Sequence, residues 1–216
     1  MILNFRLEQE FGLENPIQTL EAMNILRYVT QNFDLMLGTK KNWYEQGTSR
    51  KKALQNKIFQ EDTPIDKTIE RWNKRYKKNH PFFGEGIWDG GNDYESASIS
   101  LCTSSSSTNR RPYPLVLTIE FSIDPSNLHL TFDKTIVFFK KIININNHCT
   151  YQSLESGGYS FPKIIPKENG YQELYKKVFP DRISCGWMLF IPYTVLPELI
   201  PEAAKVVPVV DNGRQK

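Results

Sequence analysis

Residues 83–101 read FGEGIWDGGNDYESASISL, and this stretch decides the fold. Its second half, continued to residue 103, alternates small polar side chains with apolar ones, which is the pattern of a half-buried strand. Its first half holds four glycines and Trp88, so a glycine-rich turn precedes the strand. Residues 115–123 (LVLTIEFSI) follow a Ser-rich segment and predict a second strand. The two strands are therefore expected to form an antiparallel hairpin.

Upstream of this hairpin, the sequence predicts a strand and a long helix. Residues 2–8 alternate like a half-buried strand. Asn15 is suited to the N-cap of the following helix, Pro16 to its first position, and Gln18 to a capping box. Gly38 is suited to its C-terminal cap. The buried face of this helix is expected to consist of Ala22, Leu26, Val29, Phe33 and Met36.

The basic region between residues 40 and 78 predicts two more helices. Thr48 or Ser49 would cap a short first helix, with Leu54, Ile58 and Phe59 turned inward. The second begins with the sequence Thr-Pro-Ile-Asp at residues 63–66 and ends before the His-Pro pair at residues 80–81. Its apolar face is expected to comprise Ile65, Ile69, Trp72 and Tyr76.

The second half of the chain is more ambiguous. Residues 135–146 (TIVFFKKIININ) suit a strand or a helix. A helix is favoured, because Phe132-Asp133 offers an N-cap and Val137 is placed for a hydrophobic staple. Residues 168–179 predict a short helix, and residues 186–191 (GWMLFI) a buried strand. Residues 206–210 suit a last strand followed by a turn at residues 211–213, so we expect the chain to stop one strand short of a complete sheet.

Together these elements predict one α+β domain over residues 1–216. Its antiparallel sheet is expected to carry helices mainly on one face, starting near Pro16, Pro64 and Asp133. The composition, 39% hydrophobic and 12% aromatic, suits a chain that folds unaided. No apolar run is long enough to cross a membrane, and Met1 leads directly into a strand pattern without a basic segment. These features favour a cytoplasmic protein with no membrane partner.

Charge is spread unevenly along the chain. Residues 40–78 contain twelve Lys and Arg against five Asp and Glu, which is +7, and the formal total of +3 leaves −4 for the rest. Residues 85–95 hold four acids and no base. We therefore expect one basic face and one acidic loop. The basic helices at 40–78 admit an alternative function, nucleic-acid binding or an adaptor role, although no RNA- or DNA-binding motif accompanies them.

The residues that could carry chemistry are scattered. The three histidines share no metal-ligand spacing with each other or with Cys102, Cys149 and Cys185, and the cysteines form no CxxC pair. No Walker loop, GxSxG elbow or dinucleotide-binding glycine pattern occurs. We accordingly expect no catalytic residues, no metal and no cofactor, and treat an unrecognised hydrolase as a remote option.

The segment at residues 85–95 has two interpretations. In one it is a structural turn, with glycines at positive φ and Trp88 filling the core. In the other it is an exposed binding loop, whose candidate contact residues are Glu85, Trp88, Asp89, Asp93 and Glu95.

The order of these features resembles the immunity protein 52 family of bacterial polymorphic-toxin systems. The residues that carry the resemblance lie in two groups. The first runs from the glycine-rich turn into the first strand of the hairpin: Trp88, Asp89, Gly90, Asp93, Ala97, Ser98 and Ser100. The second lies at the late strand: Gly186, Trp187, Met188, Leu189 and Pro192. The likeness covers most of the chain.

The resemblance implies a non-enzymatic antitoxin that binds and neutralises a cognate protein toxin. In this family the toxins are associated with a restriction-endonuclease fold and with type VI secretion. Because a nuclease presents a cationic cleft to phosphate, the acidic loop would face the toxin and the basic region at 40–78 would face away. Under this hypothesis, Asp93→Ala weakens toxin binding.

Overall fold

The predicted hairpin lies near the middle of a seven-stranded antiparallel sheet. The computed structural model describes residues 3–92, 95–104, 113–123, 131–146, 149–156, 163–167, 170–174, 187–190, 205–207 and 209. The hairpin consists of β6 (Ala97–Thr103) and β7 (Tyr113–Ile123), and the strand order is β11-β8-β1-β7-β6-β5-β2. The other strands of the sheet are β1 (Leu3–Leu13), β2 (Tyr44–Glu45), β5 (Gly84–Trp88), β8 (Cys149–Ser156) and β11 (Met188–Phe190).

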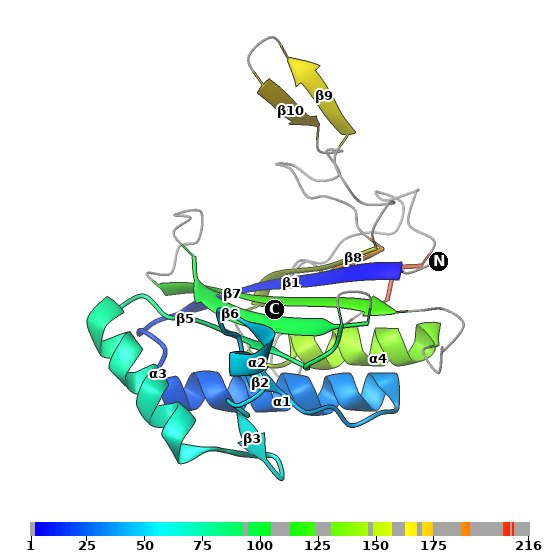
Figure 1. Ribbon diagram of the computed structural model, residues 1–216. Coiled ribbons are helices and arrows are strands. Elements are labelled where there is room, and N and C mark those ends of the chain that lie inside the picture. The colour runs from blue at the N-terminus through cyan, green and yellow to red at the C-terminus, as the bar shows by residue number, and fades with distance from the viewer. Residues whose placement is uncertain are drawn as a thin grey trace.

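Four helices and two small hairpins complete the described elements. The helices are α1 (Thr19–Leu37), α2 (Arg50–Ala53), α3 (Asp66–Asn79) and α4 (Phe132–Ile143). The hairpins pair β3 (Phe59–Gln60) with β4 (Thr63–Pro64) and β9 (Lys163–Lys167) with β10 (Gly170–Leu174). Helices α1, α3 and α4 lie on the same side of the sheet (Figure 1). The predicted α+β class and one-sided packing are confirmed.

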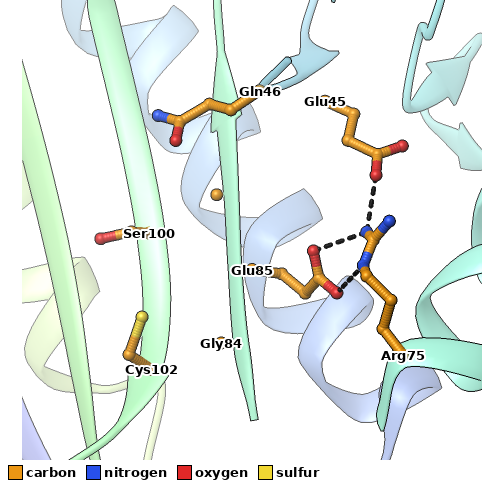
Figure 2. A pocket seen from close by; sticks show the side chains of 8 residues that line it. Glu45, Gln46, Arg75, Gly84, Glu85, Ser100 and Cys102 are labelled. Atoms are coloured by element: carbon orange, nitrogen blue, oxygen red, sulfur yellow. Dashed lines mark hydrogen bonds and ion pairs between the residues drawn. The ribbon is translucent and has the colours of Figure 1, made fainter. Parts of the chain in front are cut away.

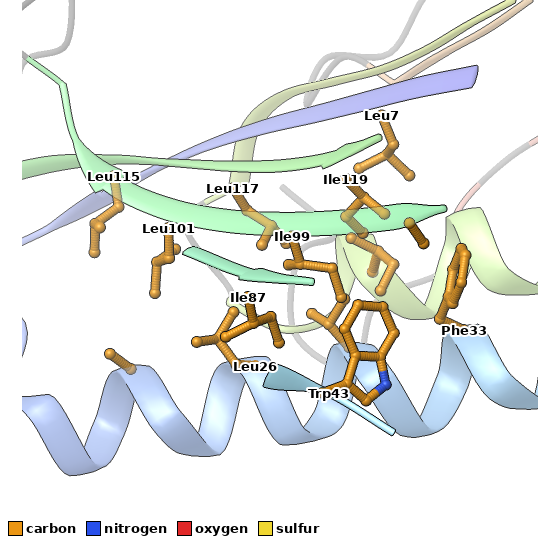
Figure 3. Packing of buried hydrophobic residues seen from close by; sticks show 14 of the residues in the cluster. Leu7, Leu26, Phe33, Trp43, Ile87, Ile99, Leu101, Leu115, Leu117 and Ile119 are labelled. Atoms are coloured by element: carbon orange, nitrogen blue, oxygen red, sulfur yellow. The ribbon is translucent and has the colours of Figure 1, made fainter. Parts of the chain in front are cut away.

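The core fills the space between the sheet and these helices (Figure 3). Alternation in β6 buries Ala97, Ile99 and Leu101, as its sequence predicts. The five residues expected on the inner face of α1 are also buried, and Gly38 ends that helix with a φ of 70°. Burial of this apolar surface, at about 25 cal/mol per Å², is the main favourable term of folding.

Two helices begin later than their sequences predict. The N-cap of α1 is Gln18 rather than Asn15, because Ile17 is buried in the core while the chain is still extended. The N-cap of α3 is Ile65, since Thr63–Pro64 pairs with Phe59–Gln60 across a turn whose two central residues both have positive φ. The local cap signals were thus overruled by burial and by strand pairing.

Further corrections concern single positions in α2 and α4. Ser49 caps α2 as predicted, and Ile58 and Phe59 are buried, but Leu54 is 40% exposed because it follows the last turn of the helix. Residues 132–143 form the favoured helix, α4. Its N-cap is Thr131, two residues before Asp133, the predicted cap.

Val137 does not form the predicted staple in α4. Its side chain is 54% exposed on the solvent side of the helix. The inner side of the same helix is taken by Phe138 and Phe139.

Three predictions for the last third of the chain also change. Within the expected helix at 168–179, Gly170–Leu174 instead forms β10, where pairing with β9 satisfies backbone groups that a short isolated helix satisfies poorly. Of the expected buried strand at 186–191, Met188–Phe190 form β11, which is half-buried because it is the edge strand of the sheet; residues 186 and 191 lie outside the described part of the chain. In the expected last strand, Val206 and Val207 are exposed and outside any strand; residues 208 and 210–213 lie outside the described part of the chain.

Candidate functional site

The loop after β5 is held by two cations from the basic region. Asp89, whose side chain is 1% exposed, forms an ion pair with Lys41 and accepts a hydrogen bond of 2.9 Å from the Gly91 amide. Arg50 donates to the carbonyls of Gly90 (2.9 Å) and Gly91 (3.1 Å), which fixes the course of the loop. The acidic loop and the basic region therefore lie against each other, and the expected separation of their charges is wrong.

Trp88 does not fill the core. Its ring is half-buried on the sheet face opposite the helices, beside Tyr44 at 6.4 Å between ring centroids. The guanidinium of Arg50 lies 5.4 Å from the centre of the indole, which is a cation–π geometry. Gly90 has a φ of 78°, so the structural interpretation holds for the turn itself.

A network of two carboxylates and two guanidiniums ties α3 to the sheet edge. Arg71 donates to Glu45 at 2.6 and 3.1 Å. Arg75 donates to Glu45 at 2.6 Å and to Glu85 at 2.7 and 2.8 Å. Glu45 and Glu85 point to the helix side because their register partners, Ile87 and Leu101, do so. The network is electrically neutral.

Burial affects the two carboxylates differently. For Glu45, burial alone would raise the pKa, but hydrogen bonds from Arg71 and Arg75 outweigh burial and hold its pKa below the ordinary value. For Glu85, burial is the larger effect, and Arg75 only partly offsets it, so its pKa is raised. Both side chains are about one-tenth exposed. Glu85 is therefore held in an ion pair with Arg75 inside the protein and is not a free contact residue.

An open pocket lies beside this network at the edge of β5, with a cavity volume of about 440 Å³. Figure 2 shows Ser100 and Cys102 on one side of β5, with Glu85 and Arg75 on the other. Burial, together with the nearby Glu85 carboxylate, raises the pKa of the Cys102 thiol. A thiol that stays protonated is a poor nucleophile. The pocket is lined by Glu45, Gln46, Arg75, Gly84, Glu85, Gly86, Ser100 and Cys102.

The predicted contact residues thus do not form one exposed loop. Glu85 and Asp89 are buried ion-pair partners, Trp88 is half-buried on the outer sheet face, and Glu95 is exposed. Asp93 lies outside the described residues, so the proposed effect of Asp93→Ala stays a prediction.

The sheet face opposite the helices carries charged residues that sequence reasoning missed. We call this surface the outer face. Strand register places Trp88, Ser98, Glu120, Arg6 and Glu155 in one row across β5, β6, β7, β1 and β8. The next two rows contain, among others, Ser100, Thr118 and Glu8, and then Cys102, Val116 and Glu10.

At the described strand positions, the outer face carries more carboxylates than basic groups. Four carboxylates (Glu8, Glu10, Glu120 and Glu155) stand against one guanidinium, that of Arg6, which gives −3 for these strand positions. Arg6 contacts Glu8 at 3.0 Å and Glu120 at 3.3 Å, and the side chains of Glu8 and Glu120 are 38% and 54% exposed. The alternation of polar residues in β1 and β7 indicated that these charged residues lie on one face of each strand, but only the strand order shows that they are neighbours.

Neither a metal centre nor a membrane-spanning helix is found in the part of the chain that the structure describes. Within it, no three His, Cys, Asp or Glu side chains come together as metal ligands. None of its helices combines the length and the apolar character needed to cross a membrane.

Comparison with protein-family models and with curated protein sequences gives no match for this chain. The resemblance to immunity protein 52 accordingly stays a hypothesis based on the quoted residues.

Proposed function

We propose that this protein is a non-enzymatic immunity protein, which binds a cationic protein toxin and so keeps the toxin from its substrate. The proposed toxin is a nuclease, as the family resemblance implies. A nuclease presents positive charge to phosphate, so an anionic surface can compete for the same region. The proposed contact surface is the outer face and no longer the acidic loop.

The observation that carries this proposal is the excess of carboxylates over basic groups at the described positions of the outer face, on paired strands of one sheet. The backbone of paired strands is already ordered, so little backbone entropy is lost when a partner binds. Complementary charge would mainly raise the association rate and select against wrong partners. The half-buried Trp88 at one end of this face offers the kind of aromatic contact that is enriched at interfaces.

The structure weakens the support for nucleic-acid binding. Five of the twelve cations between residues 40 and 78 are engaged in contacts within the protein. Lys40, Lys41, Arg71 and Arg75 pair with carboxylates, and Arg50 holds the β5 loop. The outer face would in addition repel phosphate.

The proposal is tested by co-expression in a bacterial host. Toxin and immunity genes of polymorphic systems are expected to be neighbours, so the probe is the product of the gene directly upstream. We expect this product to stop growth when expressed alone, and the present protein to restore growth. The double variant Glu8→Gln/Glu120→Gln should restore growth less well, because it removes two of the four carboxylates counted on the outer face.

The matched control is Glu70→Gln, at an exposed position on α3 on the other side of the sheet. Growth should be restored as fully by this variant as by the unchanged protein. Failure of the protein to protect against its neighbour's product contradicts the immunity function. Full protection by the double variant contradicts the assignment of the outer face.

A further inference from the structure

Strand β5 has an open edge that is one residue long. On one side β5 pairs with β6 along its whole length, and on the other side β2 pairs with Trp88 and Ile87. Gln46 then lies opposite Gly86, whose carbonyl accepts a hydrogen bond from the Gln46 amide at 3.3 Å. No described strand lies beside Gly84 on this side, and Gly84 is exposed. The opening is therefore too short for an added strand, but a single planar group can reach it.

The register with β6 shows how the backbone of Gly84 is oriented. Thr103 donates to the Phe83 carbonyl at 2.8 Å. Residues of an antiparallel pair bond alternately to the neighbouring strand, so Phe83 and Glu85 bond to β6, and Gly84 points its N–H and C=O away from it. Neither group meets a partner among the described residues. Gly84 thus presents one donor and one acceptor side by side, both directed out of the sheet edge.

An open pocket of about 440 Å³ adjoins Gly84. A Cβ on Gly84 would meet only the Cys102 sulfur, at 3.9 Å, so the space beside the Gly84 backbone is free. A Cβ on Gly86 would lie 2.8 Å from Oε1 and 3.0 Å from Cδ of Gln46, so a carboxamide of this chain already rests against the next glycine of β5. Gln46 lies at one end of the pocket and Gly84 at the other (Figure 2).

The charged groups that line the pocket are already paired with each other. Arg75 donates to Glu45 at 2.6 Å and to Glu85 at 2.7 and 2.8 Å. A charged ligand group would find no free counter-charge among the residues that line the pocket, and removing an unpaired charge from water is costly. The pocket therefore favours a neutral polar group.

We propose that Gly84 and its pocket bind a primary carboxamide. The amide oxygen accepts a hydrogen bond from the Gly84 N–H, and the amide nitrogen donates one to the Gly84 carbonyl. A carboxamide carries an acceptor and a donor in one plane, whereas a carboxylate has acceptors only and an ammonium has donors only. Either charged group would leave one of the two Gly84 groups unpaired. Of these three groups, the carboxamide alone matches both.

The carboxamide can belong to the side chain of a partner protein or to a small molecule. Ser100 and Cys102, which line the pocket, belong to rows of the outer face. An asparagine or glutamine of a protein that covers the outer face can therefore reach Gly84. The chemistry that the two sources share is the primary amide, and one probe represents each source.

The probes are benzamide, for a small molecule, and acetyl-glutamine methylamide, for a protein side chain, each titrated into the full-length ¹⁵N-labelled protein. We expect saturable NMR shifts of the Gly84 amide, with a Kd on the order of 10 mM for ligands this small. Benzoate and acetyl-glutamate methylamide, which replace the amide by a carboxylate, should bind about fivefold more weakly or less. Saturable shifts with either amide support the proposal, and the tighter of the two identifies the source. Absence of saturable Gly84 shifts with both amides would overturn it, as would equal binding of the acids.

Two variants test the role of the Gly84 N–H, with the Glu85 and Cys102 amides as reporters. Gly84→Pro removes this N–H without breaking a bond to β6, and should weaken binding of the tighter probe about fivefold. Gly84→Ala keeps the N–H and the C=O, and its Cβ meets only Cys102, so it should bind within about twofold of the unchanged protein.

Unchanged binding by a folded Gly84→Pro variant would contradict the proposal. If this variant does not fold, the comparison of amides with acids in the unchanged protein decides the question. None of these measurements involves the toxin, so the carboxamide site and the immunity function can fail independently.

Discussion

Removal of Arg75 tests the neutral network between α3 and the sheet edge. In Arg75→Met, Glu45 keeps its two hydrogen bonds from Arg71, whereas Glu85 loses its only charged partner in the network. The Glu85 side chain is 10% exposed, so its carboxylate would be left nearly buried and unpaired. The methionine retains most of the side-chain volume, which confines the change largely to charge.

The expected loss of unfolding free energy is about 2–3 kcal/mol at pH 8. Breaking a buried ion pair by removing one partner costs roughly 3–5 kcal/mol. We expect a smaller loss of unfolding free energy than this, because the Arg75 side chain is 42% exposed and water can approach the site. Adding Glu85→Gln to Arg75→Met should recover about 1–2 kcal/mol, since an uncharged amide costs less to bury.

The loss should also depend on pH. The pKa of Glu85 is already raised by burial in the unchanged protein, and removal of Arg75 raises it further. A carboxyl with a raised folded-state pKa binds its proton more tightly when folded, so its contribution to stability is present at low pH and lost as the pH rises through that pKa. Arg75→Met should therefore be less destabilising at pH 5 than at pH 8.

These losses are measured by urea unfolding at pH 5 and pH 8. The proteins compared are the unchanged protein, Arg75→Met, Glu85→Gln and the double variant. Equal stability of Arg75→Met and the unchanged protein at pH 8 would refute the reasoning. So would a double variant as unstable as Arg75→Met alone, because the loss would then not arise from the Glu85 charge.

Two other predictions concern single positions. Burial raises the pKa of Asp34 from 3.8 to about 6, so between these pH values the folded state binds the proton more tightly than the unfolded state, and stability should fall as the pH rises. Asp34→Asn should remove this pH dependence in urea titrations and stabilise the protein by about 1–3 kcal/mol at pH 7. An unchanged pH dependence in this variant would contradict the explanation. Gly90→Ala should lower the melting temperature, with a loss of about 1–3 kcal/mol, because φ is 78° and the new Cβ would lie 3.0 Å from Tyr44 Cε2. Gly84→Ala, whose Cβ meets only Cys102 Sγ at 3.9 Å, is the matched control and should stay within about 0.5 kcal/mol of the unchanged protein; equal losses in the two glycine variants would remove this explanation.

Local patterns in the sequence were sufficient for the core hairpin and the main helix. Alternation identified Ile99 and Leu101 as buried, and 3.6-residue periodicity identified the inner face of α1. These predictions hold because each depends on neighbours within one element. The N-caps failed where a distant partner decided the outcome, as when Thr63–Pro64 paired with Phe59–Gln60 in a hairpin instead of starting a helix.

The candidate site could not be predicted in the same way. A count of charges along the sequence predicted that the basic region forms one solvated face. In the structure Arg75 instead contacts Glu45, 30 residues away, and Glu85, 10 residues away, at the sheet edge. One usable signal was the four-residue spacing of Arg71 and Arg75, which places both on one side of a helix. The outer face required the strand order, because Arg6 meets Glu120 from 114 residues away.

The affinity between this protein and the product of the gene directly upstream, measured at low and high salt, tests the central claim most directly. For the unchanged protein we expect tight binding at low salt that weakens as salt screens the outer face. For Glu8→Gln/Glu120→Gln we expect a Kd about tenfold higher at low salt and a smaller salt dependence, with Glu70→Gln indistinguishable from the unchanged protein. Absence of binding, or identical affinities for the double variant and the control, would contradict the account.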